Sequence, residues 1–316
     1  MFIPVKPNFE LPRFPYLTVV ICALCIAVFL HQISTWDEYE SAFTSFCAEP
    51  KGRLTEMVMV RIAGSDSDSA CFDVLLDIDT SPDPTATIQK MADDMRPLVG
   101  LSPEDSRLYV LDKLTEQFRL YQIRVPTYPD NEFAYYTGSW NPVTMVTSSF
   151  THGSWSHIIF NLIFFFAFAT TVEVLIGGFS FIMVIIAISL FSGAFSSMAA
   201  GLIGTHYSTL GLSGVVMGMI GLNAYLLPSG TIRCYYWFIV IFGSIAVPAW
   251  ALAIWYIGWD IYNLFANADN GVVDVMAHVT GGAAGYLYGV TFLRARRRQI
   301  AALRLVKPFG DPPPVI

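Results

Sequence analysis

Charged residues are scarce in this chain. Asp, Glu, Lys and Arg make up 14% of its 316 residues, whereas soluble domains carry about 25%. The hydrophobic fraction is 54% and the mean hydropathy is +0.52. This balance excludes an ordinary soluble protein. It predicts an integral protein of the lipid bilayer, with several spans and one soluble segment.

Six apolar stretches are long enough to cross ~30 Å of hydrocarbon, which takes about 20 helical residues. They predict an all-α, polytopic bundle of six transmembrane helices. The first stretch lacks a small-residue cleavage site, so we expect it to remain as a helix rather than to be removed as a signal peptide. The predicted spans are residues 16–33, 154–172, 179–200, 212–228, 234–257 and 273–293.

Two short loops, residues 201–211 and 258–272, contain no Lys or Arg. Basic residues gather instead in residues 1–15, at Arg233 and in the tail 294–316, which six spans place on one side. The positive-inside rule therefore predicts that both termini are cytoplasmic. The sequence also lacks any N-x-S/T sequon. This absence favours a bacterial source and hence the bacterial inner membrane.

Residues 34–139 depart from the apolar composition, with 19 acidic residues against 9 basic ones. They follow the first span and are therefore expected on the exoplasmic (periplasmic) side. Residues 57–64 and 70–79 read as two strands around a polar turn. Residues 85–95 read as a helix, and 102–123 as a longer, capped one. We expect a small α+β insert, whose acidic surface gives no sign of a nucleic-acid partner.

The chain has five cysteines, and two of them, Cys47 and Cys71, fall in this insert. They can form a disulfide if the insert faces an oxidising compartment, and remain free thiols if it does not. Cys22 and Cys25 lie in the first apolar stretch, where packing is the simplest role for both. The sequence leaves the state of Cys47 and Cys71 open.

Polar side chains inside apolar spans are costly, and for that reason they are functional candidates. Each one here lies within about two helical turns of the exoplasmic end of its span. His157 and Asn161 are four residues apart and share one helix face. We expect the group to converge in a pocket that exoplasmic water reaches. Its members are His152, His157 and Asn161 at the start of the second span, Ser213 in the fourth, and Asp274 and His278 in the sixth.

Glycines spaced four apart mark two of these spans. Small residues at this spacing let membrane helices approach closely. One set lies beside Ser213 and the other follows His278, so packing between them would bring a serine within hydrogen-bond reach of a base. The sets are Gly214 and Gly218 in the fourth span, and Gly281, Gly285 and Gly289 in the sixth.

Each polar residue also has a simpler interpretation. A serine beside such glycines is most often a packing residue, and Asn161 can bridge two helices. The histidines lack close ligand pairs with a cysteine or carboxylate, so we expect no metal site. Val215 stands where GxSxG needs glycine, which excludes the α/β-hydrolase elbow. A transporter is disfavoured because no inverted repeat or broken helix pair is visible.

Taken together, three motifs resemble those of the rhomboid intramembrane serine proteases. GLSGVVMG (211–218) is similar to their GxSGxxxG, AHVTGGAAG (277–285) to their AHxxGxxxG, and HGSWSHIIFN (152–161) to their HxxxxHxxxN. The motifs occur in the family order on the expected spans, and the resemblance covers residues 140–293. It implies the bacterial six-span bundle with an enlarged first exoplasmic loop.

The resemblance also implies roles for individual residues. Ser213 would be the nucleophile and His278 the general base and acid of a Ser–His dyad, with Asp274 in a structural role. His157, Asn161 and the Ser213 backbone N–H would hold the oxyanion. No cofactor is implied, and the implied partners are transmembrane protein substrates. The residues expected to line the same cavity are His152, Gly211, Gly214 and Met217.

Two positions depart from the family pattern. Asn141 follows Trp140 where the family often has arginine, and Met217 stands where it often has an aromatic ring. The implied activity is cleavage of membrane-anchored proteins in or near their transmembrane segment. The alternative is a catalytically inactive rhomboid-like binder of membrane proteins. Such relatives usually lose the serine or the histidine, and both are present here.

Overall fold

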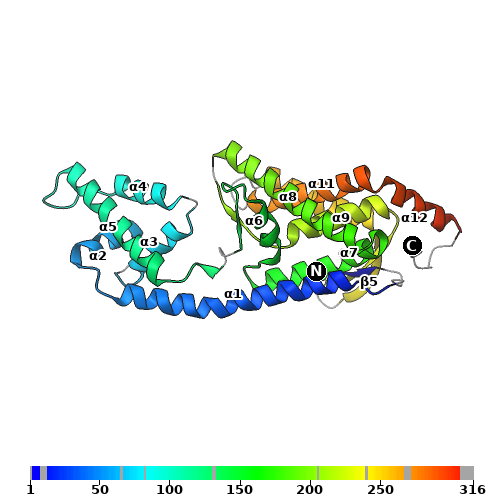
Figure 1. The fold of residues 1–316 in the computed structure, drawn as a ribbon, viewed down its shortest axis with the longest axis horizontal. Coiled ribbons are helices and arrows are strands. Elements are labelled where there is room, and N and C mark those ends of the chain that lie inside the picture. Colours follow the sequence, from blue (N-terminus) through cyan, green and yellow to red (C-terminus); the bar gives the residue numbers. More distant parts are fainter. Residues whose placement is uncertain are drawn as a thin grey trace. The chain divides into compact units, whose positions relative to one another are not determined.

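The computed structural model describes residues 2–7, 13–64, 67–81, 83–129, 133–204, 206–238, 241–266 and 272–306. The chain divides into two compact units, which are described separately (Figure 1). One unit combines Met1–Phe29 with Phe133–Ile316, and the other is Leu30–Glu132. The boundary falls inside the first helix, α1 (Tyr16–Ala48).

The first unit is built mainly from helices. They are α6 (Pro142–Thr147), the 3-10 turn η2 (Ser148–Phe150), α7 (Trp155–Ile176), α8 (Gly178–Ile203), α9 (Ser213–Leu226), α10 (Ala249–Ala266), α11 (Val272–Phe292) and α12 (Arg294–Val306). The predicted spans at 154–172, 179–200, 212–228 and 273–293 coincide with four of these helices. Among the described residues, α1, α7 and α8 are long and apolar enough to cross a membrane, and α9 is a shorter apolar helix.

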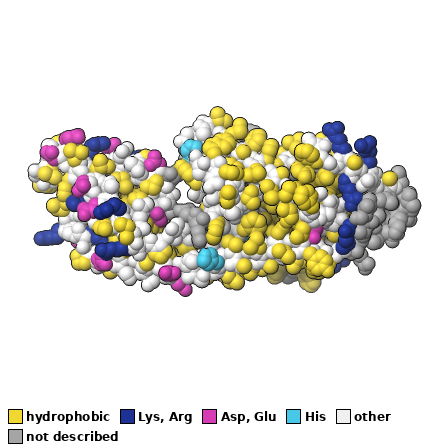
Figure 2. Space-filling model, viewed as in Figure 1, with side chains coloured by type: hydrophobic (Ala, Val, Ile, Leu, Met, Phe, Trp, Pro, Cys, Tyr) yellow, Lys and Arg dark blue, Asp and Glu magenta, His cyan; other side chains and the backbone are white. Residues whose placement is uncertain are grey.

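Large apolar side chains are exposed along α7, α8, α10 and α11. Figure 2 shows such side chains spread over the visible face of this unit. Beneath them, one apolar cluster joins these helices, with Phe165, Phe168, Phe181 and Met219 fully buried. A folded unit that is apolar both inside and outside is suited to a lipid environment, and the protein is an integral membrane protein.

The predicted span at 234–257 is wrong in its first half. β4 (Thr231–Phe238) and β5 (Ile241–Pro248) form an antiparallel hairpin there, and only then does α10 begin. β1 (Phe2–Pro7) adds a third strand beside β4, so the chain is not all-α. The hairpin segment is rich in β-branched and aromatic residues, and an apolar run of this kind reads as helix or strand alike.

Side chains fix several helix starts. The Glu173 carboxylate of α7 accepts hydrogen bonds from the backbone N–H of Leu17 (3.0 Å) and of Thr18 (2.7 Å), and so caps α1. Asn141 caps α6 by accepting from the N–H of Val143 at 3.0 Å. Asn141 thus has a structural role at the position where the family motif often has arginine.

The second unit is entirely helical where it is described, which corrects the α+β expectation. Its helices are α2 (Arg53–Ala63), α3 (Ser67–Asp79), α4 (Pro84–Asp94) and α5 (Pro103–Arg124), with the later part of α1. The segments read as strands are α2 and α3. Their buried residues follow helical spacing, with Val58 and Met59 inward on α2 and Val74, Leu75 and Ile78 inward on α3.

The two helices predicted at 85–95 and 102–123 are confirmed as α4 and α5. Ser102 caps α5 as predicted, because its hydroxyl oxygen accepts from the N–H of Asp105 at 3.1 Å. Their apolar faces join the core of this unit, in which Val110 and Leu114 are fully buried.

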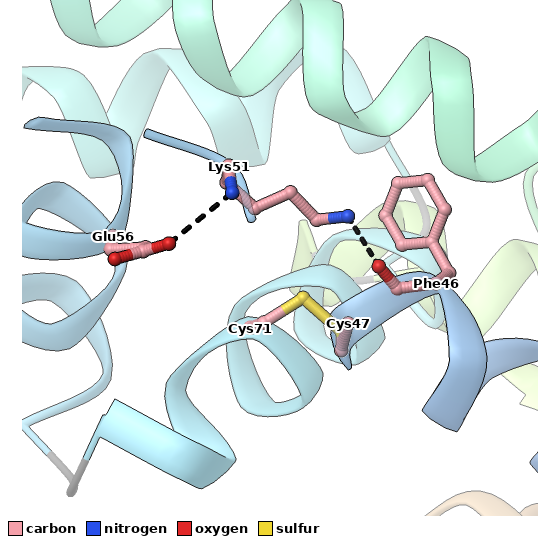
Figure 3. Close-up of a disulfide and its surroundings, with 5 residues drawn as sticks. All are labelled: Phe46, Cys47, Lys51, Glu56 and Cys71. Carbon is pink, nitrogen blue, oxygen red and sulfur yellow. Dashed lines mark hydrogen bonds between the residues drawn. A yellow bond between two sulfur atoms is a disulfide. The ribbon is translucent and has the colours of Figure 1, made fainter. Parts of the chain in front are cut away.

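Cys47 and Cys71 form a disulfide, with 5.7 Å between their Cα atoms. Figure 3 shows this bridge joining the end of α1 to α3. Beside it, the Lys51 ammonium donates to the backbone carbonyl of Phe46 and lies 3.8 Å from the centre of the Phe46 ring. The bond closes a loop of sequence separation 24 that contains α2, and so fastens α3 to the end of α1.

Candidate active site

Ser213 is the first residue of α9, directly after a sharp turn. Gly211 adopts a φ of +118°, which L side chains rarely take, and its N–H donates to the carbonyl of Ser148 at 2.8 Å. The first N–H groups of a helix have no partner within it and carry the positive end of its dipole. Ser213 therefore lies where backbone donors face outward from the helix end.

The side chains of His157 and Asn161 reach this same turn from α7. A methyl group built on Gly211 would lie 2.7 Å from Nε2 of His157 and 3.8 Å from Nδ2 of Asn161. Glycine is thus required at this position by both conformation and space. Ser154 caps α7 by accepting from the N–H of His157 at 3.2 Å, which fixes the first turn that carries the histidine.

The glycine motifs of α9 and α11 lie face to face. A methyl group on Gly281 would overlap the carbonyl of Gly214, and one on Gly285 would overlap that of Gly218. The two helix backbones therefore touch without intervening side chains. Gly289 lies lower on the same face, where a methyl group would meet the Tyr225 ring.

The contact between α9 and α11 brings the His278 segment beside Ser213. Ser192 of α8 donates to the carbonyl of Ala277 at 3.1 Å, and Ala277 and Ser213 line one cavity. Within the described part of the chain, no hydrogen bond joins the side chains of Ser213 and His278. Nδ1 of His278 instead lies 3.0 Å from Oδ2 of Asp260 on α10.

A small polar cavity opens beside Ser213. Its volume is about 30 Å³, which is room for one or two water molecules. Gly211 and Gly214 contribute to its wall. Hydroxyl groups dominate the rest, so water held there has several hydrogen-bond partners. The serines that line it, besides Ser213, are Ser148, Ser149, Ser189, Ser192 and Ser196.

His152 lies in the segment before α7 and is fully buried. Its ring contacts that of His157 edge to face, with 5.1 Å between their centres. Burial and, to a smaller extent, the neighbouring His157 lower the pKa of His152 to about 4, so it is neutral at physiological pH. A neutral ring packed on His157 restricts how that side chain can turn.

The other predicted positions are placed as follows. Met217 is half-buried and packs against the apolar core of the unit. It is not among the described residues that line the serine cavity. The side chain of Asp274 lies outside the described residues. Within the described ranges, no group of three or more His, Cys, Asp or Glu side chains is arranged to hold a metal ion.

Asp260 is the polar residue that the sequence did not single out. Its side chain is 14% exposed and that of His278 is 22% exposed. The predicted fifth span ended at residue 257, so Asp260 was assigned to a loop. The available signal was a single carboxylate within the aromatic run WYIGWDIYNL, which α10 carries as part of one helix.

Comparison with known proteins identifies the region of the chain that carries this site. A family profile described as Rhomboid domain matches residues 139–295. The chain is 25% identical over 162 residues to "Rhomboid protein 1, mitochondrial" of Saccharomyces cerevisiae, a match that covers 50% of this chain and 44% of that protein. The chain thus matches less than half the length of this relative. The matched region carries α7, α9 and α11 with all three motifs, and the protein belongs to the rhomboid family.

Proposed function

We propose that this protein is an intramembrane serine endopeptidase that cleaves membrane-anchored proteins in or near their transmembrane segment. The observation that carries the proposal is the position of His157 and Asn161 against Gly211. Two side chains able to donate hydrogen bonds meet the turn that leads into Ser213 at the start of α9. That juxtaposition suits the stabilisation of an oxyanion formed at the serine.

In the proposed reaction, Oγ of Ser213 attacks the scissile carbonyl and its proton passes to His278. The tetrahedral oxyanion accepts hydrogen bonds from Asn161, His157 and the Ser213 backbone N–H, each such donor contributing ~2.7–4 kcal/mol. Collapse breaks the C–N bond, and the leaving amine takes the proton from His278. An acyl-enzyme remains on Ser213.

Water then attacks the acyl-enzyme, with His278 accepting a proton from it and returning that proton to Ser213. The serine-lined cavity beside Ser213 supports this step because it can hold a water molecule next to the acyl group. Hydrolysis inside an apolar unit requires a supply of water, and a polar cavity beside the nucleophile can provide it.

The proposed substrates are single-span proteins with small residues at the cut and helix-weakening residues in the span. The proposed setting is the bacterial inner membrane, with both termini cytoplasmic and the active site open to the periplasm. Fusions of alkaline phosphatase and of green fluorescent protein to the C-terminus test this orientation. We expect fluorescence without phosphatase activity, and the reverse result would contradict it.

A second candidate function is a catalytically inactive, rhomboid-like binder of membrane proteins. The specific observation in its favour is that Ser213 and His278 share no hydrogen bond within the described residues. In apo enzymes such contacts often tighten only when substrate binds, so the enzyme remains the better-supported candidate.

The two functions are separated by purified protein in liposomes with a fluorescent single-span reporter. We expect the wild type to cleave the reporter and to be labelled at Ser213 by a fluorophosphonate. Ser213→Ala and His278→Ala are each expected to abolish cleavage without loss of folded protein. Cleavage that persists in Ser213→Ala would overturn the mechanism. A folded wild type that neither cleaves nor labels would support the binder.

A further inference from the structure

Within the described ranges, His278 has one charged neighbour from the helices packed against it. α11 contacts α8, α9 and α10, and also α12, whose first arginine, Arg294, lies 16 residues after His278. α8 and α9 contain no Asp, Glu, His, Lys or Arg, and Asp260 is the only such residue of α10. Among the side chains that the structure describes, one carboxylate thus meets the imidazole, and it does so at Nδ1, at 3.0 Å.

The chemistry of a carboxylate fixes the direction of this hydrogen bond. An ionised carboxylate only accepts, so Nδ1 of His278 must carry the hydrogen and donate it to Oδ2 of Asp260. In a neutral imidazole with hydrogen on Nδ1, the lone pair is on Nε2. Nε2 is then the atom available to accept a proton from a serine hydroxyl.

The location of the contact differs from that of an ordinary surface salt bridge. Both side chains are mostly enclosed, with exposed fractions of 14% and 22%. Placing a carboxylate in an apolar helix costs free energy. The neighbouring Trp255 and Trp259 are exposed aromatic residues, whose packing does not explain why a carboxylate is present. The histidine that it contacts is the residue proposed as general base.

We propose that Asp260 is a positioning residue for His278, and that it acts on the Ser213–His278 pair through the imidazole without touching the substrate. Asp260 holds the imidazole in the tautomer with hydrogen on Nδ1 and orients the ring. When the proton of Ser213 Oγ moves to Nε2, the carboxylate stabilises the resulting imidazolium. No proton passes to Asp260, and the proton leaves from Nε2 to the amine. This inference rests on the proposed protease function.

The test compares variants in liposomes, with the reporter cleavage assay and the rate of fluorophosphonate labelling at Ser213. Asp260→Asn keeps the side-chain shape but removes the charge, and we expect kcat to fall roughly 10- to 100-fold with little change in KM. Asp260→Glu keeps the carboxylate and is expected to recover part of that loss. Trp259→Phe is the matched control, one residue away on the exposed side of α10, and should retain wild-type kcat.

A second measurement does not depend on activity. ¹⁵N NMR of histidine-labelled wild-type protein, with the His278 signal assigned by difference from His278→Ala, reports which ring nitrogen carries the hydrogen. We expect hydrogen on Nδ1 in the wild type, and a shift toward hydrogen on Nε2 in Asp260→Ala.

The outcomes are distinct. An inactive wild type contradicts the proposed function, whereas the NMR measurement still tests the pairing of Asp260 with His278. An active wild type with unchanged kcat in Asp260→Asn overturns the positioning role alone. The role is also overturned if Asp260→Asn and Asp260→Glu lose activity equally along with thermal stability, or if hydrogen resides on Nε2 of the wild-type His278.

Discussion

Gly281 of α11 packs directly on the backbone of Gly214 in α9. The contact lies one residue after Ser213 and three residues after His278, so it sets the distance between the helices at the level of the site. Any side chain at residue 281 must push the carbonyl of Gly214 away. The separation of the proposed nucleophile and base is thus fixed by the absence of side chains.

Gly281→Ala is expected to destabilise the protein by about 1–3 kcal/mol, because overpacking against backbone cannot be relieved by a rotamer change. Cleavage should fall with it. Gly201→Ala on α8 is the matched control, since a methyl group there meets no atom within 4 Å. Thermal unfolding in detergent micelles gives the unfolding temperature of each variant. Equal unfolding temperatures for the two variants would contradict the packing interpretation.

Gly211→Ala is expected to reduce cleavage roughly 10²-fold, the size of effect that a misplacement of about 1 Å produces. The added methyl group would lie 2.7 Å from Nε2 of His157 and displace it. Gly204→Ala is the control, because Gly204 also has a positive φ of 76° but has open space around it. If both variants lose activity alike, backbone strain rather than displacement of His157 is the cause.

Asn161→Ala is expected to lower kcat by roughly 10²–10³ with little change in KM, because its Nδ2 group would donate only to the charged intermediate. Asn161→Asp should be at least as harmful, since a carboxylate would repel the oxyanion. Steady-state cleavage of the reporter gives both constants. A change confined to KM would show that Asn161 acts in substrate binding instead.

His152 makes the stability of the folded state pH-dependent. Its folded pKa of about 4 is below the ordinary value of about 6.5, so the unfolded chain takes up the proton first. The contribution of neutral His152 to the free energy of unfolding is therefore fully present above pH 6.5 and is lost as the pH falls toward 4. It amounts to about 3 kcal/mol. His152→Gln should flatten unfolding free energy against pH in this window. An unchanged slope would contradict this assignment.

The Cys47–Cys71 bond is expected to stabilise the second unit by about 3 kcal/mol, from the loop of 24 residues that it closes. Reduction, or Cys47→Ser, should therefore speed limited proteolysis between residues 50 and 100 on the order of 100-fold. Cys22→Ala removes a thiol from outside this unit and should leave the rate unchanged. Equal proteolysis before and after reduction would show that helix packing alone holds the unit.

Local signals in the sequence were sufficient for several elements. The apolar lengths of α7, α8 and α11 and the Ser102 cap of α5 are properties of short segments, and each was predicted. The segments 57–64 and 70–79 were predicted wrongly as strands. Their apolar residues alternate over a few positions, and the helical face that they form is recognised only once the helices packed against it are known.

Tertiary context decided the remaining features. Residues 231–248 pair as strands partly because β1 lies beside β4, and that pairing joins segments far apart in the chain. Asp260 is likewise ordinary in sequence and becomes notable only through its distance to His278. The three motifs were sufficient to predict the candidate site, whereas the carboxylate that contacts its histidine could be identified only from the structure.

The strand pairing of β1 with β4 also has a consequence for biosynthesis. Phe2 lies opposite Tyr236, so β1 is translated long before its neighbour exists. During that interval its backbone N–H and C=O groups have no ladder to join, and the sheet can close only after the intervening helices have emerged. The β1–β4 pairing therefore cannot form before β4 has emerged, and its closure marks a chain completed at least as far as that strand.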